Sequence, residues 1–328
     1  MVGAGDHRDI GVVAVDFAEM KGYSALREGA AWLDLSARGK IKLTGEDRAR
    51  LLHAMTTNHI QQLTPGTGCY AFFLTVQGRI LSDANVLCRP DHILLELEPE
   101  TREKVYQHLD HYIIADDVAL EDVTAQTATI AVEGPGSAAV IEAMGAPVPE
   151  AEYASVEWGT RLVARLNTTG GLGFFVMAPV AEKEQLIEQI EATGAVAADA
   201  EAFRAVRLEN GKPRYGDDLS ERYLAQEANV PRALNFNKGC YLGQEIVERV
   251  RSRGQIHRVL MPVELETKVA PAAGAKLTVG DAAAAEITSV AYSPALGKVV
   301  ALAYVRTDYA RPGTKMMLGD IPAEIRAL

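Results

Sequence analysis

The character of the sequence changes near residue 255. Before that point, β-rich runs alternate with helical patterns; after it, the chain consists of short β segments separated by glycine or proline turns, from HRVLMPVELE to KMMLG. Short strands at this spacing are typical of a small all-β barrel or sandwich. We therefore predict an α+β region over 1–254, built from two subdomains, and a β-barrel domain over 255–328.

The first region carries the signals of antiparallel sheets and packed helices. Three β-rich runs, CYAFFLTV, GRILSDANVLCR and HILLELEP, follow one another with turn residues at 77–78 and 90–91, which predicts a meander. ETREKVYQHLDHYI places Val105 and Leu109 on one helical face. RLVARLNTTGGLGFFVMAP predicts a hairpin. Hairpins, rather than repeated βαβ units, indicate the α+β class.

Composition excludes several classes of function. A formal charge of −11 argues against broad nucleic-acid binding, which depends on neutralising phosphates. No apolar run reaches the roughly 20 residues that a membrane-spanning helix needs. The start, MVGAGDHRDIGVVAVDF, lacks the features of a signal peptide. Cys69, Cys88 and Cys240 form no CxxC pair, which favours a reducing compartment. We expect a cytoplasmic protein without a membrane or general nucleic-acid partner.

The stretch NKGCYLGQEI, residues 237–246, combines a cysteine, a lysine and two glycines. Asn235 or Asn237 could cap a helix that starts near Leu242. Cys240 would then lie beside a helix N-terminus and near Lys238, and both features lower the pKa of a thiol. No His or Asp is evident as its general base. From the pattern alone, a functional cysteine and an inert buried one are equally supported.

Two further features are candidates for ligand binding. Asp83 follows a tight turn at Gly78, where its carboxylate could bind an amine or a pterin-like ring, or simply face outward from a strand. In ERVRSRGQIHR, four cations crowd together on an acidic protein and would favour a compact anion, or form a solvated surface: Arg249, Arg251, Arg253 and Arg258.

Two other patterns are weaker evidence for a functional site. TTGGLG, at 168–173, lacks the GxGxxG spacing of a dinucleotide site and reads as a hairpin turn. His108 and His111 lie three residues apart, but no further clustered ligand is evident, so an exposed helix face is the better interpretation and we predict no metal site.

KGCYLGQE resembles the K-G-C-Y-x-G-Q-E motif of the YgfZ family. These folate-binding proteins support iron–sulfur cluster assembly or repair and are relatives of the glycine-cleavage T-protein, an aminomethyltransferase. Other segments also resemble the family, in the same order along nearly the whole chain. Among them are LDLSARGKIKLTGED, RLENGKPRYGDD and ITSVAYSPALGKVVALAYV. The resemblance implies a T-protein-like ring of three domains around a central hole that holds a reduced folate.

The resemblance also implies roles for individual residues. We expect tetrahydrofolate, or a one-carbon derivative of it, as the cofactor. Asp83 would face the pterin, while Cys240 would carry redox or one-carbon chemistry beside Lys238. The motif is also expected to contact the folate, through Lys238, Tyr241, Gln244 and Glu245. Apart from the resemblance, we infer that Arg249 and Arg251 would meet the anionic glutamate tail.

Departures from the T-protein pattern favour the resemblance to the YgfZ family over the resemblance to the T-protein. Where T-proteins carry a paired aspartate, this chain has Ser82–Asp83; where they carry T-G-E-x-G-F-E, it has Gly171 and Phe175 in place of the glutamates. T-proteins also lack the motif cysteine. The leading prediction is therefore a tetrahydrofolate-binding protein that assists iron–sulfur assembly or repair in client enzymes, with tRNA-modifying enzymes among the candidates. The alternatives are an aminomethyltransferase, and a non-catalytic folate-dependent scaffold in which Cys240 is structural.

Overall fold

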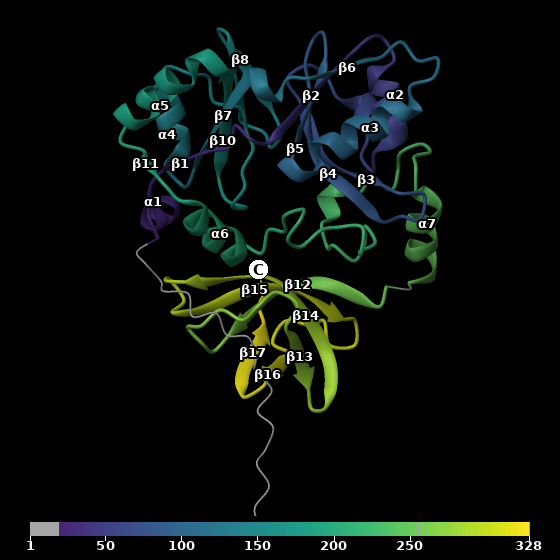
Figure 1. The fold of residues 1–328 in the computed structure, drawn as a ribbon, viewed down its shortest axis with the longest axis vertical. Helices are drawn as coiled ribbons and strands as arrows, with labels where there is room; N and C mark the ends of the chain where they lie inside the picture. Colours follow the sequence, from purple (N-terminus) through teal and green to yellow (C-terminus); the bar gives the residue numbers. More distant parts are fainter. Residues whose placement is uncertain (1–19, 255, 328) are drawn as a thin grey trace, which may run out of the picture.

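The computed structural model describes residues 20–254 and 256–327, so the stretch assessed for a signal peptide lies outside the described residues. Within that range the chain forms two α+β lobes, side by side, and a β-barrel below them (Figure 1). The predicted α+β class with a C-terminal all-β barrel is confirmed. No helix in the described part of the chain is both long and apolar enough to cross a membrane.

The first lobe is an antiparallel sheet with two helices on one face. Its strand order is β3 (Gly68–Leu74), β4 (Ile80–Cys88), β5 (Ile93–Leu97), β2 (Gly39–Thr44) and β6 (Ala119–Asp122). The predicted meander is β3–β4–β5. Helices α2 (Arg48–Met55) and α3 (Arg102–Tyr112) bury their apolar faces against it, with Val105 and Leu109 fully buried, as the helical period predicts.

The second lobe is a six-stranded sheet. Its order is β11 (Val196–Ala197), β1 (Ala31–Asp34), β7 (Thr127–Glu133), β10 (Gly173–Pro179), β9 (Arg161–Ala164) and β8 (Ser155–Trp158). The predicted hairpin is β9–β10. Helices α4 (Ser137–Ala143) and α5 (Lys183–Ala192) pack on one face.

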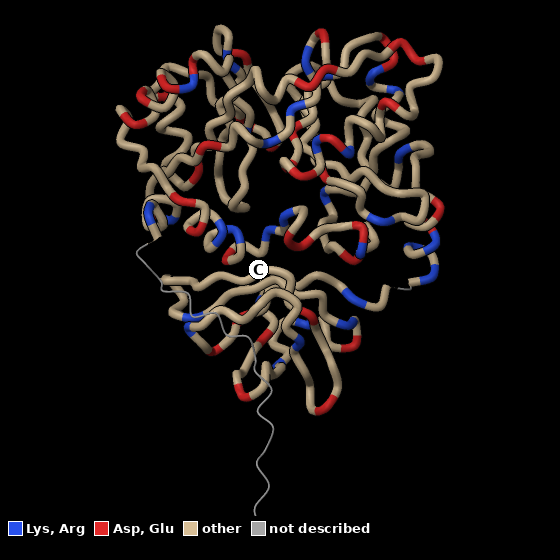
Figure 2. Tube along the Cα trace, in the orientation of Figure 1, with Lys and Arg blue, Asp and Glu red and all other residues tan. Residues whose placement is uncertain are grey.

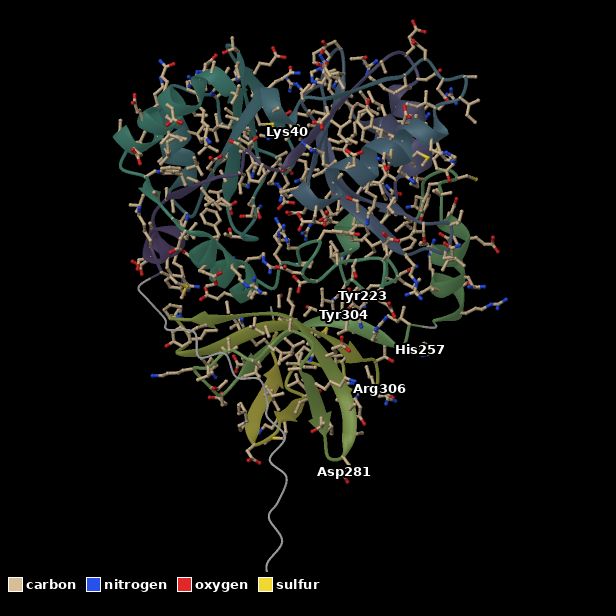
Figure 3. All side chains as sticks on the ribbon, in the orientation of Figure 1. Lys40, Tyr223, His257, Asp281, Tyr304 and Arg306 are labelled. Atoms are coloured by element: carbon tan, nitrogen blue, oxygen red, sulfur yellow. The ribbon has the colours of Figure 1, made fainter. Side chains whose placement is uncertain are left out.

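The other face of the second sheet packs on the first lobe. Leu87 and Leu94 of the first lobe share an apolar cluster with Phe175 and Met177 of the second. At this junction the side chain of Lys40 is fully buried (Figure 3), and its ammonium donates to the carbonyl oxygens of Ser36 (2.8 Å) and Thr127 (3.2 Å).

The barrel is closed and has its own core. Its strands run in the order β12 (Arg258–Leu265), β15 (Lys298–Arg306), β14 (Ala282–Ser293), β13 (Lys276–Val279), β16 (Lys315–Leu318) and β17 (Ile321–Ile325). Closure leaves no sheet edge exposed. Inward-facing aliphatic side chains, such as Val263, Leu277 and Val305, fill the interior.

Three helices and two tyrosines join the barrel to the lobes. α6 (Ala200–Glu209) packs on β14 and β15, α1 (Tyr23–Glu28) packs on α6, and α7 (Gln244–Arg253) precedes the barrel. Tyr223, in the segment before α7, stacks on Tyr304 of β15, with ring centroids 3.6 Å apart (Figure 3). The guanidinium of Arg258 lies 4.8 Å from the Tyr223 ring and pairs with Glu227 at 3.2 Å.

Candidate functional site

A cavity of about 370 Å³ opens between the two lobes and α6. Segments of both lobes and of the connection to the barrel form its walls: the turn between β1 and β2, the strands β3 and β4, the segment after β5, the segment before β8, the β9–β10 hairpin, α6 with the loop after it, and Arg232. Basic and acidic residues meet along the segments between the lobes and the barrel (Figure 2). Cavities of ~300–1,000 Å³ are the usual size of small-molecule sites.

Asp83 lies in the wall of this cavity and is buried. β4 places it opposite β3, from which the Tyr70 hydroxyl donates a hydrogen bond of 2.6 Å to its carboxylate. Burial raises the pKa of Asp83 from 3.8 to about 6, and the charge of Glu98 adds to the rise. The carboxyl can therefore exchange a proton close to neutral pH, which is the property that acid–base chemistry needs.

Several cations line the cavity, and most of them are already paired. Arg38 pairs with Glu96 and Glu98, and Arg214 pairs with Glu98 at 2.9 Å. Arg207 of α6 pairs with Asp218 at 2.6 Å. These arginines hold the walls together, because each of them forms a salt bridge with a buried carboxylate.

Three cavity cations are different. Within residues 20–254 and 256–327, Arg165, Lys212 and Arg232 form no salt bridge. The guanidinium of Arg232 lies 5.4 Å from the Tyr70 ring. Unpaired cations in a cavity wall can bind an anionic ligand. Sequence reasoning missed all three, although Lys212 stands in the RLENGKPRYGDD block that carries part of the resemblance.

The predicted motif lies outside the cavity. None of its candidate site residues lines the wall: Lys238, Cys240, Tyr241, Gln244, Glu245, Arg249 and Arg251. The segment docks instead on the C-terminal end of α2, where the Lys238 ammonium donates to the carbonyl oxygens of His53 (2.5 Å) and Thr56. The backbone N–H of Leu242 donates to Ala54 at 2.9 Å. Lys238 thus caps a helix end, where a cation is favoured by the helix dipole.

Cys240 is exposed, and its surroundings differ from those expected. The Lys238 ammonium is turned into the protein, and the thiol whose pKa it lowers is Cys69, although burial still raises that pKa to about 12. α7 begins at Gln244, and Gly243 occupies the N-cap position at φ 83°. The predicted cap by Asn235 or Asn237 is therefore wrong: Asn235 instead accepts a hydrogen bond from the backbone of Asn237 at 2.9 Å.

The remaining motif residues are spread over a surface and a core. Tyr241 is buried, and burial raises its pKa to about 12. The Gln244 side chain accepts a hydrogen bond from the Tyr241 backbone at 3.1 Å. Glu245 and Arg249 are exposed, and Arg251 lies 4.8 Å from the Phe236 ring. The structure does not bring these residues together with Asp83, so their role in folate binding stays a prediction.

Comparison with known proteins places the whole chain in one family. Residues 16–238 match the family described as the GCVT N-terminal domain, and residues 258–325 match the glycine-cleavage T-protein C-terminal barrel domain. The chain belongs to the glycine-cleavage T-protein family. It is 30% identical to an aminomethyltransferase of Streptomyces avermitilis, over 98% of this chain and 94% of that protein. An aminomethyltransferase of Rubrobacter xylanophilus is 29% identical, over 98% and 90%.

A solved structure bears on the fold. The crystal structure of the glycine cleavage system aminomethyltransferase T from Bartonella henselae has a TM-score of 0.88 to this chain at 20% identity, covering 96% of this chain and 90% of that one. The T-protein fold expected from the resemblance is confirmed.

The positions at which this member departs from the T-protein pattern lie in different settings. Phe175 and Ser82 are fully buried, and Phe175 packs in the apolar cluster between the lobes. Gly171 lies in the β9–β10 loop, where a Cβ atom would meet only Thr169 and Asn210, at 3.8 and 3.9 Å. Phe175 is thus a core side chain, whereas the space beside Gly171 is open.

The raised pKa of Asp83 predicts a pH-dependent cost to stability. Because the folded protein binds this proton more tightly than the unfolded chain, the ionised carboxyl destabilises the native state increasingly as the pH rises from about 4 to about 6. Asp83→Asn should therefore match the thermal midpoint of the wild type at pH 4 and exceed it at pH 7.5. Asp110→Asn, on the exposed face of α3, is the control. A midpoint difference that does not change with pH would contradict the shift.

The position of Lys238 predicts a role in stability. Lys238→Met keeps the length of the side chain but leaves two carbonyl oxygens at the end of α2 without a donor. We expect a loss of about 1–3 kcal/mol, measured as a lower midpoint in urea unfolding. Lys268→Met, at an exposed position, should leave the midpoint unchanged. Equal midpoints for the two variants would show that Lys238 does not act as a cap.

Proposed function

We propose that this protein binds a reduced folate, tetrahydrofolate or a one-carbon derivative of it, in the cavity between the lobes. The observation that carries the proposal is the buried Asp83–Tyr70 pair in a wall that also bears unpaired cations. The pterin of a folate offers N–H and amino donors, which a carboxylate accepts. Its glutamate tail offers carboxylates, which cations bind.

The pterin and the glutamate tail of a folate fit different parts of the cavity wall. Asp83 is buried, so the pterin would enter the cavity to reach it. Arg232 is exposed and Arg165 is half-buried, so they are suited to a tail that extends toward solvent. The tail contacts therefore fall to Arg165 and Arg232, rather than to Arg249 and Arg251, which lie away from the cavity.

The role that we propose for the bound folate is support of iron–sulfur cluster assembly or repair in client enzymes. Two observations favour it. Ser82, Gly171 and Phe175 stand where the T-protein motifs carry acidic residues, which weakens the chain as an aminomethyltransferase. Cys240 is exposed on the segment that resembles the YgfZ motif, so its thiol is accessible to another protein.

A second candidate is aminomethyl transfer. The relatives named as aminomethyltransferases are similar to this chain over nearly its full length, and Asp83 keeps one carboxyl in the cavity. A third candidate, a folate-dependent scaffold with a structural Cys240, gains nothing from the geometry because an exposed side chain contributes little to packing.

The first experiment measures folate binding and turnover on one sample. We expect the purified protein to bind tetrahydrofolate, and Asp83→Asn to weaken binding about tenfold through the loss of a charged acceptor. With tetrahydrofolate and an aminomethylated lipoyl carrier protein, we expect no methylenetetrahydrofolate above the uncatalysed rate. Turnover would make the protein an aminomethyltransferase. Absence of binding would refute the folate proposal itself.

The second experiment tests the thiol in cells that depend on this protein. Cys240→Ser should lower the activity of an iron–sulfur enzyme, because serine lacks the nucleophilic and redox chemistry of a thiol. Cys88→Ser, which changes a half-buried cysteine outside the motif, should not. If the two variants support equal activity, Cys240 has no reactive role and the scaffold candidate replaces the leading one.

A further inference from the structure

Lys212 is fixed at the cavity wall by the β9–β10 hairpin loop. Its ammonium donates to the backbone oxygen of Asn167 and, at 2.8 Å, to the side-chain oxygen of the same residue. Gly170, at φ +85°, lies along its aliphatic stem: a Cβ atom at Gly170 would come within 3.3 Å of the Lys212 Cβ. The loop thus holds both the stem and the head of this lysine.

One hydrogen of the Lys212 ammonium is left over. A lysine ammonium carries three N–H donors, and Asn167 accepts two of them. No other described residue accepts the third, and Lys212 lines the cavity. The third donor is therefore available to a ligand.

The charges around Lys212 come from four other parts of the chain. They are Glu133 on β7, Arg38 before β2, Asp83 on β4 and Arg232 beyond α6. Glu133 already accepts hydrogen bonds from Thr168 and Thr169, and Arg38 is already paired.

Asp83, which accepts one hydrogen bond from Tyr70, and Lys212, which has one donor left, line the same cavity with no salt bridge between them. A ligand that lies between them must present a donor to Asp83 and an acceptor to Lys212.

We propose that Lys212 donates its free hydrogen to the carbonyl oxygen of a formyl group on the bound folate, so that the cavity prefers a formyl-tetrahydrofolate to unsubstituted tetrahydrofolate. This inference rests on the proposed folate site. A formyl oxygen that enters the cavity loses water and binds poorly unless a donor meets it. Asp83 cannot be that donor once it is ionised, and Lys212 can.

The test compares tetrahydrofolate with 5-formyltetrahydrofolate by binding isotherms at pH 7. The wild type should bind the formyl compound more tightly. Lys212→Met should lose about tenfold or more in affinity for the formyl compound, with little change for tetrahydrofolate. Lys212→Arg, which keeps a charged donor, should retain the preference. Lys276→Met, at an exposed barrel position, is the control for loss of a lysine.

The pH profile separates ligand binding from a merely structural role. Burial lowers the pKa of Lys212 from 10.5 to about 8. The preference for the formyl compound should therefore decline between pH 7 and 9 in the wild type and persist in Lys212→Arg, because arginine stays charged.

Three results would overturn the inference. If Lys212→Met weakens both compounds equally, the lysine binds the pterin carbonyl or only holds the hairpin loop. If the variant weakens neither compound, its free donor meets no ligand. If the wild type binds neither compound, the folate site itself is wrong, and that failure is distinct from the first two.

Discussion

A continuous chain of ion pairs beside the cavity joins the first lobe to α6 and the loop after it, and hydrogen bonds extend this chain to the barrel. Arg38 and Arg214 share Glu98, Arg214 and Arg207 share Asp217, and Arg207 reaches Asp218. Asp218 is fully buried and accepts hydrogen bonds from Thr288 and Ser289 of the barrel. Buried ion pairs add little net stability, but removing one partner leaves a costly unpaired charge. These ion pairs and hydrogen bonds therefore hold the first lobe, α6 and the barrel together along one wall of the cavity.

The segment from Arg232 to Lys238, which leads into KGCYLGQE, has a structural task that its composition does not reveal. β3 is the edge strand of its sheet, and residues around Thr57 cover that edge, with Thr57 bonded to Phe72 at 3.0 Å. The segment from Arg232 to Asn235 then bonds to Thr57 and Asn58, and Lys238 closes the end of α2. An open edge would invite pairing with another chain. One stretch of sequence thus runs from the cavity, at Arg232, to the exposed Cys240.

Local sequence patterns predict the helices and strands, whereas contacts between residues far apart in the sequence determine which side chains form the cavity. The β3–β5 meander, the β9–β10 hairpin and the barrel follow from alternation, turn residues and period, which neighbouring residues determine. Asp83 was identified because it follows a recognisable turn. Arg232 and Lys212 were not, because a cation in a loop gives no local sign that its carboxylate partners are absent. The sequence favours a chemical role for Lys238 because Cys240 is its visible neighbour. Its actual acceptors, the carbonyl oxygens of His53 and Thr56, lie far away in the sequence and give no local sign.

The alternation of β3 explains why Lys238 lies apart from the cavity. Tyr70 faces the cavity, while its neighbour Cys69 packs with the core on the other face, near Lys238. Successive side chains of a strand point to opposite faces, so the sheet separates Tyr70 from Cys69, whereas Tyr241 of the motif packs in the same apolar cluster as Tyr70. Cys240 lies on the surface beyond that division and outside the cavity wall. In this arrangement the thiol is accessible from solvent and not from the cavity, so any coupling between the two must run through the segment that connects Arg232 to Cys240.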